Sequence, residues 1–372
     1  MLKLVKSNQK NFLTKLDMIL KKRKFQNPEI ELKVKKIIQD VKKNKDSALI
    51  KYEKKYSKLK NISLRNIKFS ATEKNKIIKK LDKKTKNSID LAFNRIFNFH
   101  KKQKLSSYSF RDKFKNSFSY KTSALNKVGV YVPGGQASYP SSVLMNCIPA
   151  LVAGVEEIYM TTPAMNKIYN PAVIYAAQKC KVKEIYKIGG AQAIAAMTYG
   201  TKIIQKVDKI VGPGNIFVAN AKKQVFGEVG IDMIAGPSEV TIVADKSSKP
   251  DWIAADLIAQ AEHDETSQSI VIADDIKIIK NVRNAGSIFI GEYSPEAIGD
   301  YLAGPNHVLP TSGTARFSSG LSVYDFLKRY SVIKMTKSGI ERLGTSVINL
   351  AKYENLEGHA NSIKIRLKKQ ED

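Results

Sequence analysis

Two side chains with metal-binding chemistry, Gln260 and His263, stand three residues apart in the sequence. Ile253, Leu257 and Ile258 precede them at helical spacing, which predicts a helix with one buried face. Because residues three apart on a helix project from the same side, we expect both polar side chains together near the helix end. An imidazole nitrogen and an amide oxygen are workable zinc donors, although glutamine is an uncommon one. Two donors do not make a site, so other segments must supply more.

Further candidate donors lie in the final third of the chain, which holds three of the four histidines, His263, His307 and His359. A zinc site needs three or four donors from separate elements. Gln260, His263, Asp300 and His359 would meet that need if the fold brought them together, which spacing alone does not establish. The short metal signatures H-E-x-x-H and paired C-x-x-C are absent from the sequence.

Three glycine-rich turns form a second group of candidate site residues: Tyr131–Gln136, Gly189–Gln192 and Gly212–Asn215. From Val128 onward, predicted strands alternate with predicted helices, which indicates a largely parallel sheet covered on both faces. The turns follow strands, so we expect them at the carboxyl edge, where ligands bind in such sheets. None has the G-x-G-x-x-G pattern, and a single turn is also ordinary strand–helix punctuation. The three together indicate a nucleotide or small-molecule site.

The region around the predicted zinc helix carries one more candidate, Ser238, which follows a Gly-Pro pair. Its hydroxyl is either presented to a cleft or used in a turn or helix cap, and spacing does not decide between these. Ser269–Ala273 is predicted to be a buried strand, and Ala285–Gly291 is predicted to be another. The join between them, near Lys277–Val282, is too short for a crossover helix between parallel neighbours.

These elements predict an α/β protein with incomplete doubly wound, Rossmann-like parallel sheets in two main domains. A helical arm occupies residues 1–25, and a nucleotide-facing domain spans residues 128–238. A discontinuous domain combines residues 26–127 with 239–320 and carries the zinc-site residues. Residues 321–372 form a C-terminal tail, in which Ser322–Tyr330 is expected to be helical and Ser362–Leu367 to be a strand.

Charge is distributed unevenly, because residues 1–130 hold 37 Lys+Arg against 10 Asp+Glu, out of 63 and 34 in the whole chain. The lysines are dispersed around predicted helices and no nucleic-acid motif accompanies them, so we expect a solvated surface and not a nucleic-acid site. No apolar run is long enough to span a membrane, and the N-terminus has no pattern of a secretory signal. Cys147 and Cys180 lie in apolar contexts, as buried thiols do in a reducing cytoplasm.

Taken together, the motifs resemble the histidinol dehydrogenase family over nearly the whole chain. The segments that carry the resemblance include VGVYVPGG, GGAQAIAAM, VDKIVGPGNIFV, IDMIAGPSEV, DLIAQAEHD, RNAGSIFIG, GDYLAGPNHVLPTSGTARF and EGHANS. The resemblance implies a cytoplasmic, zinc-requiring oxidoreductase at the last step of histidine biosynthesis. It would oxidise L-histidinol through L-histidinal to L-histidine and reduce two NAD. It also implies a domain-swapped homodimer in which each tail completes the active site of the other subunit.

The resemblance carries the family's site residues onto definite positions of this sequence. It implies zinc ligands from one subunit at Gln260, His263 and Asp300, with His359 from the other. It implies substrate contacts at Ser238, Gln260, His263, Asp300, Glu354 and His359. It implies NAD contacts at Tyr131, Gln192 and Asn215, one from each glycine-rich turn.

The chain departs from the family at the join near Lys277–Val282. The family carries an adjacent glutamate and histidine there, as water activator and general base, but the only Glu-His pair of this chain is Glu262-His263. Losing such a pair costs about 10²–10⁴ in rate, so no catalytic residue is assigned. The join is either the product of an incomplete or mis-joined gene or the mark of a natural shortened homologue, unless another residue such as His307 serves as base. A shortened homologue would act as a non-catalytic partner subunit or as a basic nucleic-acid-binding scaffold.

Overall fold

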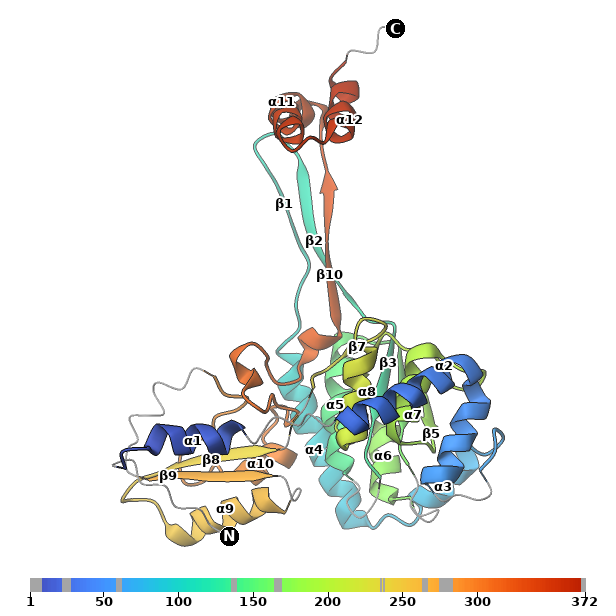
Figure 1. The fold of residues 1–372 in the computed structure, drawn as a ribbon, viewed down its shortest axis with the longest axis vertical. Helices are drawn as coiled ribbons and strands as arrows, with labels where there is room; N and C mark the ends of the chain where they lie inside the picture. Colours follow the sequence, from blue (N-terminus) through green and yellow to red (C-terminus); the bar gives the residue numbers. More distant parts are fainter. Residues whose placement is uncertain are drawn as a thin grey trace. The chain divides into compact units, whose positions relative to one another are not determined.

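The computed structural model describes residues 9–21, 28–57, 62–134, 139–163, 169–234, 236, 238–262, 267–273 and 284–368. The chain forms two compact units. The first comprises Met1–Lys104 and Leu125–Phe326, and the second comprises Leu105–Ala124 and Leu327–Asp372. Each unit has its own sheet and helices (Figure 1).

A five-stranded sheet organises the first unit, with strand order β5-β4-β3-β6-β7. Its strands are β3 (Lys127–Tyr131), β4 (Glu157–Thr161), β5 (Glu184–Tyr186), β6 (Lys209–Val211) and β7 (Gly230–Ile231). All four pairings are parallel, as the strand–helix alternation predicts. The connecting helices are α5 (Pro140–Ala153), α6 (Pro171–Lys179), α7 (Gly190–Tyr199) and α8 (Ile216–Val225). The predicted mixed α/β fold with a parallel sheet is thereby confirmed.

The strands of this sheet are short apolar runs because helices exclude water from both of their faces. Val128 and Val130 in β3 and Ile210 in β6 are fully buried. The helix α5 is also almost wholly buried, and it ends at Gly154, whose φ of 93° is the left-handed conformation that suits a helix C-terminus. Burial on this scale makes the sheet a rigid support for the turns at its edge.

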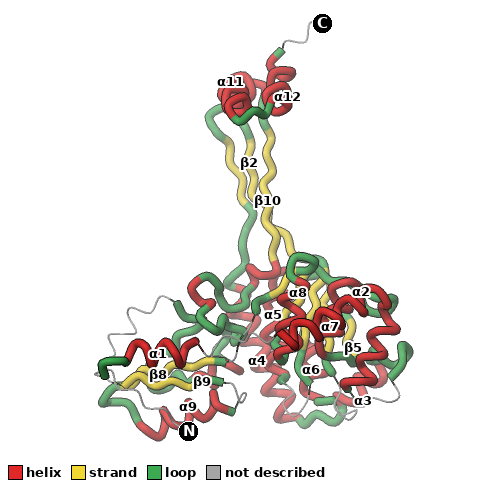
Figure 2. The backbone as a smooth tube through the Cα atoms, viewed as in Figure 1, coloured by secondary structure: helices red, strands yellow, loops and turns green. Residues whose placement is uncertain are grey.

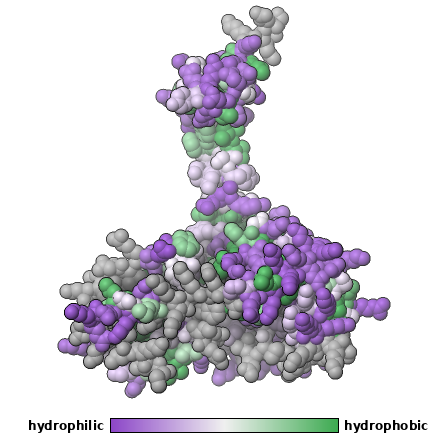
Figure 3. All heavy atoms as spheres, viewed as in Figure 1, coloured by the Kyte–Doolittle hydropathy of each residue, from purple (hydrophilic) through white to green (hydrophobic). Residues whose placement is uncertain are grey.

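The N-terminal helices are α1 (Phe12–Lys21), α2 (Pro28–Tyr56), α3 (Ala71–Ile78) and α4 (Lys83–Lys101). The apolar stripe of α2 is buried, and α2 packs against α7 and α8. As the capping-box pattern predicts, the Ser70 hydroxyl accepts a hydrogen bond from Glu73 N (3.1 Å) at the start of α3. The surface over α2 and α3 is largely hydrophilic (Figure 3), consistent with a solvated lysine-rich face.

A second parallel pair, β8 (Glu239–Ala244) and β9 (Gln268–Ala273), lies in the same unit with α9 (Pro250–Ala261) and α10 (Glu296–Tyr301). Two predictions fail here. The strand predicted to be buried, β9, leaves Val271 and Ile272 about 40% exposed (41% and 39%). The strand predicted at Ala285–Gly291 is absent from the described residues, where Ile288 and Ile290 are exposed. In both cases apolar side chains of the segment remain exposed within the described residues.

The second unit is a three-stranded antiparallel sheet followed by two helices (Figure 2). It contains β1 (Tyr108–Arg111), β2 (Ser117–Ala124), β10 (Leu327–Lys334), α11 (Lys337–Tyr353) and α12 (Glu357–Leu367). Two further predictions were wrong here. Most of the predicted helix Ser322–Tyr330 is a 3₁₀ turn, Val323–Phe326, and then β10, which pairs with β2 along its whole length. The predicted strand Ser362–Leu367 is part of α12 and packs on α11.

The domain boundaries and the tail exchange expected from the sequence stay predictions. Among the described residues, no helix combines the length and the apolar composition needed to cross a bilayer.

Candidate functional site

The glycine-rich turns meet at one edge of the five-stranded sheet, as predicted. The chain runs from β3 outward to β4 and β5, and then returns to place β6 on the other side of β3. Val130 pairs with Val211, so Tyr131, the last residue of β3, and Gly212, which follows β6, lie at the ends of neighbouring strands. A reversal of strand order of this kind is where open parallel sheets bind ligands.

A buried ion pair fixes the turn after β6. Gly212 has φ +115°, and a Cβ there would lie 2.1 Å from the Tyr131 carbonyl oxygen, so only glycine fits. Gly212 N donates to Asp232 Oδ2 (2.8 Å), and Lys222 Nζ donates to the Gly212 carbonyl (3.0 Å). Lys222 and Asp232 also pair directly, and both side chains are almost fully buried. Neither residue was singled out from the sequence, since each is an ordinary surface type there.

The three predicted NAD-contacting residues differ in exposure. Tyr131 and Gln192 are buried, whereas Asn215 is exposed and caps α8 by accepting from Phe217 N (3.1 Å) and Val218 N (3.2 Å). The Tyr131 hydroxyl accepts from Gly190 N (3.0 Å), and burial raises the pKa of Tyr131 to about 12. Gln192 Nε2 donates to Glu53 Oε1 (2.8 Å). Glu53, which is on α2, was missed by sequence reasoning.

Ser238 lies at the start of the β8–β9 region and is exposed. Its carbonyl accepts a hydrogen bond from Gln268 N (2.9 Å). The loop after α10 contacts both sides of Ser238, because Gly236 N donates to Thr311 Oγ1 (2.8 Å) and the Glu239 side chain accepts from Ser312 N (3.2 Å). Ser238 is therefore an exposed residue in a segment held by its neighbours, and its role stays a prediction.

Gln260, on the last turn of α9, is 1% exposed. Neither its side-chain oxygen nor its side-chain nitrogen has a hydrogen-bond partner within the described residues. A buried amide without partners costs about 1–3 kcal/mol, so most such groups in proteins are satisfied by a ligand or water. An amide oxygen is an acceptable zinc donor. Gln260 therefore fits the metal that the sequence predicts.

Asp300 lies near the end of α10, and α10 packs against α9. His307 Nδ1 is 3.6 Å from Asp300 Oδ1. The pKa of Tyr301 is raised, first by burial and then by the charges of Asp300, Tyr139 and Glu262. Since Glu262 follows the end of α9, the ends of the two helices that carry Gln260 and Asp300 lie near each other.

The other predicted zinc ligands lie outside the part of the first unit that the structure describes. His263 lies outside the described residues, while Glu354 and His359 are exposed residues of the second unit. Within the described ranges, no three His, Cys, Asp or Glu side chains gather as a metal site would require. Gln260 and Asp300 thus lie on two helices that pack against each other, and the whole predicted ligand set stays a prediction.

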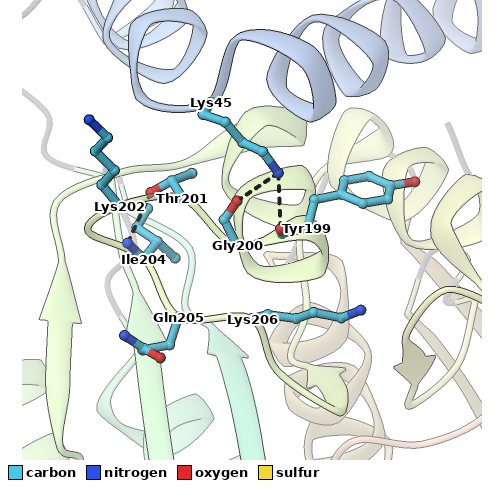
Figure 4. Close-up of a pocket in the computed structure, with 8 residues that line it drawn as sticks. All are labelled: Lys45, Tyr199, Gly200, Thr201, Lys202, Ile204, Gln205 and Lys206. Carbon is cyan, nitrogen blue, oxygen red and sulfur yellow. Dashed lines mark hydrogen bonds between the residues drawn. The ribbon is translucent and has the colours of Figure 1, made fainter.

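A cavity of about 410 Å³ lies elsewhere, beside the segment between α7 and β6 (Figure 4). Its lining includes Lys45, Lys202 and Lys206, and Lys45 Nζ donates to the carbonyls of Tyr199 and Gly200 (3.1 Å each). This segment precedes β6, so the cavity opens at the amino edge of the sheet. It is at the edge opposite the glycine-rich turns and is not the predicted nucleotide site.

The fold and the turn geometry define an α/β protein with parallel sheets and a ligand edge at the reversal of strand order. The family model for histidinol dehydrogenase matches residues 20–283 and 270–367. A histidinol dehydrogenase of Pelagibacter ubique is 47% identical over 433 residues, covering 100% of both chains. Histidinol dehydrogenase 1 of Trichormus variabilis is 40% identical, covering 98% of both. The crystal structure of histidinol dehydrogenase from Elizabethkingia anophelis superposes with a TM-score of 0.87 at 33% identity, covering 95% of this chain and 96% of that one. The chain belongs to the histidinol dehydrogenase family.

The comparisons also bear on the short join near Lys277–Val282. The alignment with the Pelagibacter relative spans 433 positions, 61 more than the 372 residues of this chain. The family model matches in two parts that meet within residues 270–283. The two parts of the family match therefore overlap at the join where the sequence departs from the family.

Proposed function

We propose that this protein oxidises L-histidinol through L-histidinal to L-histidine, the last step of histidine biosynthesis, with NAD as hydride acceptor and zinc as the metal. The observation that carries the proposal is Gln260, in a chain of the histidinol dehydrogenase family. Its amide atoms are buried and unpaired within the described residues, at the helix end where the sequence predicts a metal ligand. A leucine would fill this volume without leaving polar atoms unsatisfied, so a ligand accounts for the glutamine.

The carboxyl edge of the five-stranded sheet supports NAD as the hydride acceptor. The turns that carry Tyr131, Gln192 and Asn215 converge there, and Gly212 brings its backbone against that of Tyr131. Exposed Asn215 would meet the dinucleotide with its side chain, the Tyr131 hydroxyl holds the Gly190 amide of the turn, and the Gln192 side chain is held by Glu53.

Gln260, His263 and Asp300 would hold zinc, with His359 of the partner subunit as the fourth ligand. The bound metal would supply a fixed positive charge that orients the substrate and exchanges no electrons. The accessible hydroxyl of Ser238 would bind the substrate, as would Glu354 from the exchanged tail. His307, beside Asp300, would help to orient that carboxylate.

Each oxidation removes a hydride, which NAD accepts, and a proton, which requires a base. The family's adjacent glutamate and histidine have no counterpart in this sequence. The 61 extra positions of the Pelagibacter relative favour a second candidate function, a homologue that binds zinc and NAD but turns over slowly. General acid–base catalysis contributes about 10²–10⁴ in rate, which sets the scale of the expected deficit.

A second copy of this chain is the proposed partner. The helix α11 exposes Leu343, Val347 and Leu350 at helical spacing on one side, an apolar stripe that water would otherwise cover. Leu350→Asp is expected to shift the protein from dimer to monomer in sedimentation velocity. Thr345→Asp, an equal charge on a different side of α11, is the control and should remain dimeric. Equal behaviour of both variants would reject this interface.

The function is tested with purified, zinc-loaded protein. NADH formation from NAD and histidinol is measured by absorbance, and NAD binding is measured separately by calorimetry. Turnover that is abolished by a chelator and restored by zinc supports the proposed oxidation. NAD and zinc binding without turnover identifies the impaired homologue. Absence of binding of either one would reject the assignment.

A further inference from the structure

Two buried carboxyl groups on one face of α2 accept hydrogen bonds from the backbone at the two ends of α7. Asp46 and Glu53 are seven residues apart, two helical turns, and are 7% and 0% exposed. Asp46 Oδ2 accepts from Lys202 N (3.0 Å), just past the C-terminus of α7. Glu53 Oε1 accepts from Gly189 N (3.0 Å), just before its N-terminus. The two contacts show that the second half of α2 runs antiparallel to α7.

The Glu53 contact lies at the carboxyl edge of the sheet, where the glycine-rich turns meet. Glu53 Oε1 also accepts from Gln192 Nε2 (2.8 Å), and the next peptide, Gly190 N, donates to the Tyr131 hydroxyl. One carboxyl group therefore fixes the turn backbone and the side chain of a predicted NAD residue. The Asp46 end lies at the opposite edge, beside the lysine-lined cavity.

Glu53 is a costly residue for a merely structural contact. A buried carboxylate loses its hydration, and no salt bridge to a cation is seen for Glu53 in the described part of the chain. Burial raises the pKa of the Glu53 carboxyl, against the hydrogen bonds from Ser57, Gly189 and Gln192, which favour its charged form. An apolar residue would pack against α7 without this cost, which argues for a role at the site.

We infer that Glu53 is a positioning residue of the nucleotide site, which sets the Gly189–Gln192 turn and the Gln192 amide for NAD. The inference rests on the proposed function, because NAD is the ligand of that edge. Removing the carboxyl frees the Gly189 amide and the Gln192 side chain to take other partners. NAD binding must then order the turn and the Gln192 side chain, and this costs free energy that the wild-type chain does not lose on binding.

The experiment compares NAD affinity, by calorimetry on the full chain, in wild type, Glu53→Ala, Glu53→Gln and Asp46→Ala. Asp46→Ala is the matched control, since it removes a buried carboxyl from the same face of α2 with the same kind of contact. Thermal unfolding and hydrogen exchange of the peptide spanning 187–199 are recorded on the same four proteins.

We expect Glu53→Ala to weaken NAD binding by about tenfold or more. Asp46→Ala should stay within about twofold of wild type even though its unfolding temperature falls comparably. Glu53→Gln should recover most of the affinity, because its amide oxygen accepts the same two hydrogen bonds. Equal NAD affinity in wild type and Glu53→Ala, or equal losses in Glu53→Ala and Asp46→Ala, would overturn the role of Glu53. A wild-type chain that binds no NAD overturns the nucleotide site itself.

Discussion

The two parallel sheets of the first unit have similarly apolar strands, but these strands differ in how deeply they are buried. In the five-stranded sheet, Val130 and Ile210 are fully buried. In the β8–β9 pair, Val271 and Ile272 are about 40% exposed (41% and 39%), although their segment is as apolar. Parallel strands need helices on both faces. The strands of the two regions are thus similarly apolar. They differ in how far helices cover them in the described part of the chain.

The incomplete region is the one interrupted by the short join. The alignment with the Pelagibacter relative has 61 more positions than this chain has residues. The two parts of the family match overlap at residues 270–283. The sheet carrying the glycine-rich turns does not depend on that segment. We therefore expect the proposed nucleotide region to be intact while the proposed zinc region is weakened, and the following changes separate the two.

The largest effect is expected from restoring the absent segment. Inserting the Pelagibacter residues that align opposite the join, between Lys277 and Val282, should raise kcat for histidinol oxidation by about 10²–10⁴, because the family resemblance implies that this segment carries the adjacent glutamate and histidine. It should also bury β9 and raise the unfolding temperature. Rate is measured as NADH formation under saturating NAD and histidinol.

The control for this insertion carries alanines in place of its Glu-His pair. It should regain the stability without the rate, which separates covering the sheet from supplying the base. Unchanged stability in both inserted proteins would mean that exposure of β9 does not arise from the missing segment.

The next effect concerns the complete region, at the buried Lys222–Asp232 pair. Lys222→Met leaves the Asp232 charge buried without its cation, which is expected to cost about 3–5 kcal/mol in unfolding free energy. Lys223→Met is the control, since Lys223 is half exposed and pairs with Glu31 at 2.9 Å on the surface. It should cost less than about 1 kcal/mol in urea unfolding. Similar losses would show that the turn after β6 does not depend on the ion pair.

A matched pair of valines compares the sheets directly. Val130→Ala in β3 should lower the unfolding free energy by about 2–3 kcal/mol, because it opens a cavity in a packed core. Val271→Ala in β9 should cost less than about 1 kcal/mol, since that side chain is already partly in water. Both are measured by urea denaturation. A larger loss for Val271→Ala would mean that another chain covers β9 in solution.

The smallest effect is expected at Gln260. Without metal, Gln260→Leu should raise stability by about 1 kcal/mol, because it removes buried amide atoms that have no partner in the described residues. The same variant should lose the rise in unfolding temperature that zinc gives the wild type. A destabilised metal-free variant would instead indicate that the amide is satisfied within the protein.

Much of the ligand edge could be predicted from the sequence, because strand–helix alternation has few topological solutions. The turns at Tyr131, Gly189 and Gly212 had to fall at one edge once the sheet was parallel. Glu53 could not be found in this way. It lies on a lysine-rich helix 139 residues before Gln192, and its partner is set by packing. The available signal was an acid beside the apolar stripe of Leu49 and Tyr52.

The wrong predictions share a cause. The secondary structure of each segment was decided by the neighbouring element and not by the local sequence pattern. Ser362–Leu367 is helical because Ile363 and Leu367 pack closely on Gly344 of α11. Residues beyond Phe326 form a strand because β2 is available to pair with them. Ala285–Gly291 has strand composition but no partner among the described residues. In each case the sequence pattern is ambiguous until the neighbouring element is known.

The pairing of β8 with β9 alone also has a consequence outside catalysis. Among the described residues, β8 and β9 pair as strands only with each other, so each is an edge strand, and Val271 and Ile272 of β9 are exposed. Such a border recruits strands from other molecules. Concentrated preparations of this chain should therefore form β-rich assemblies over time.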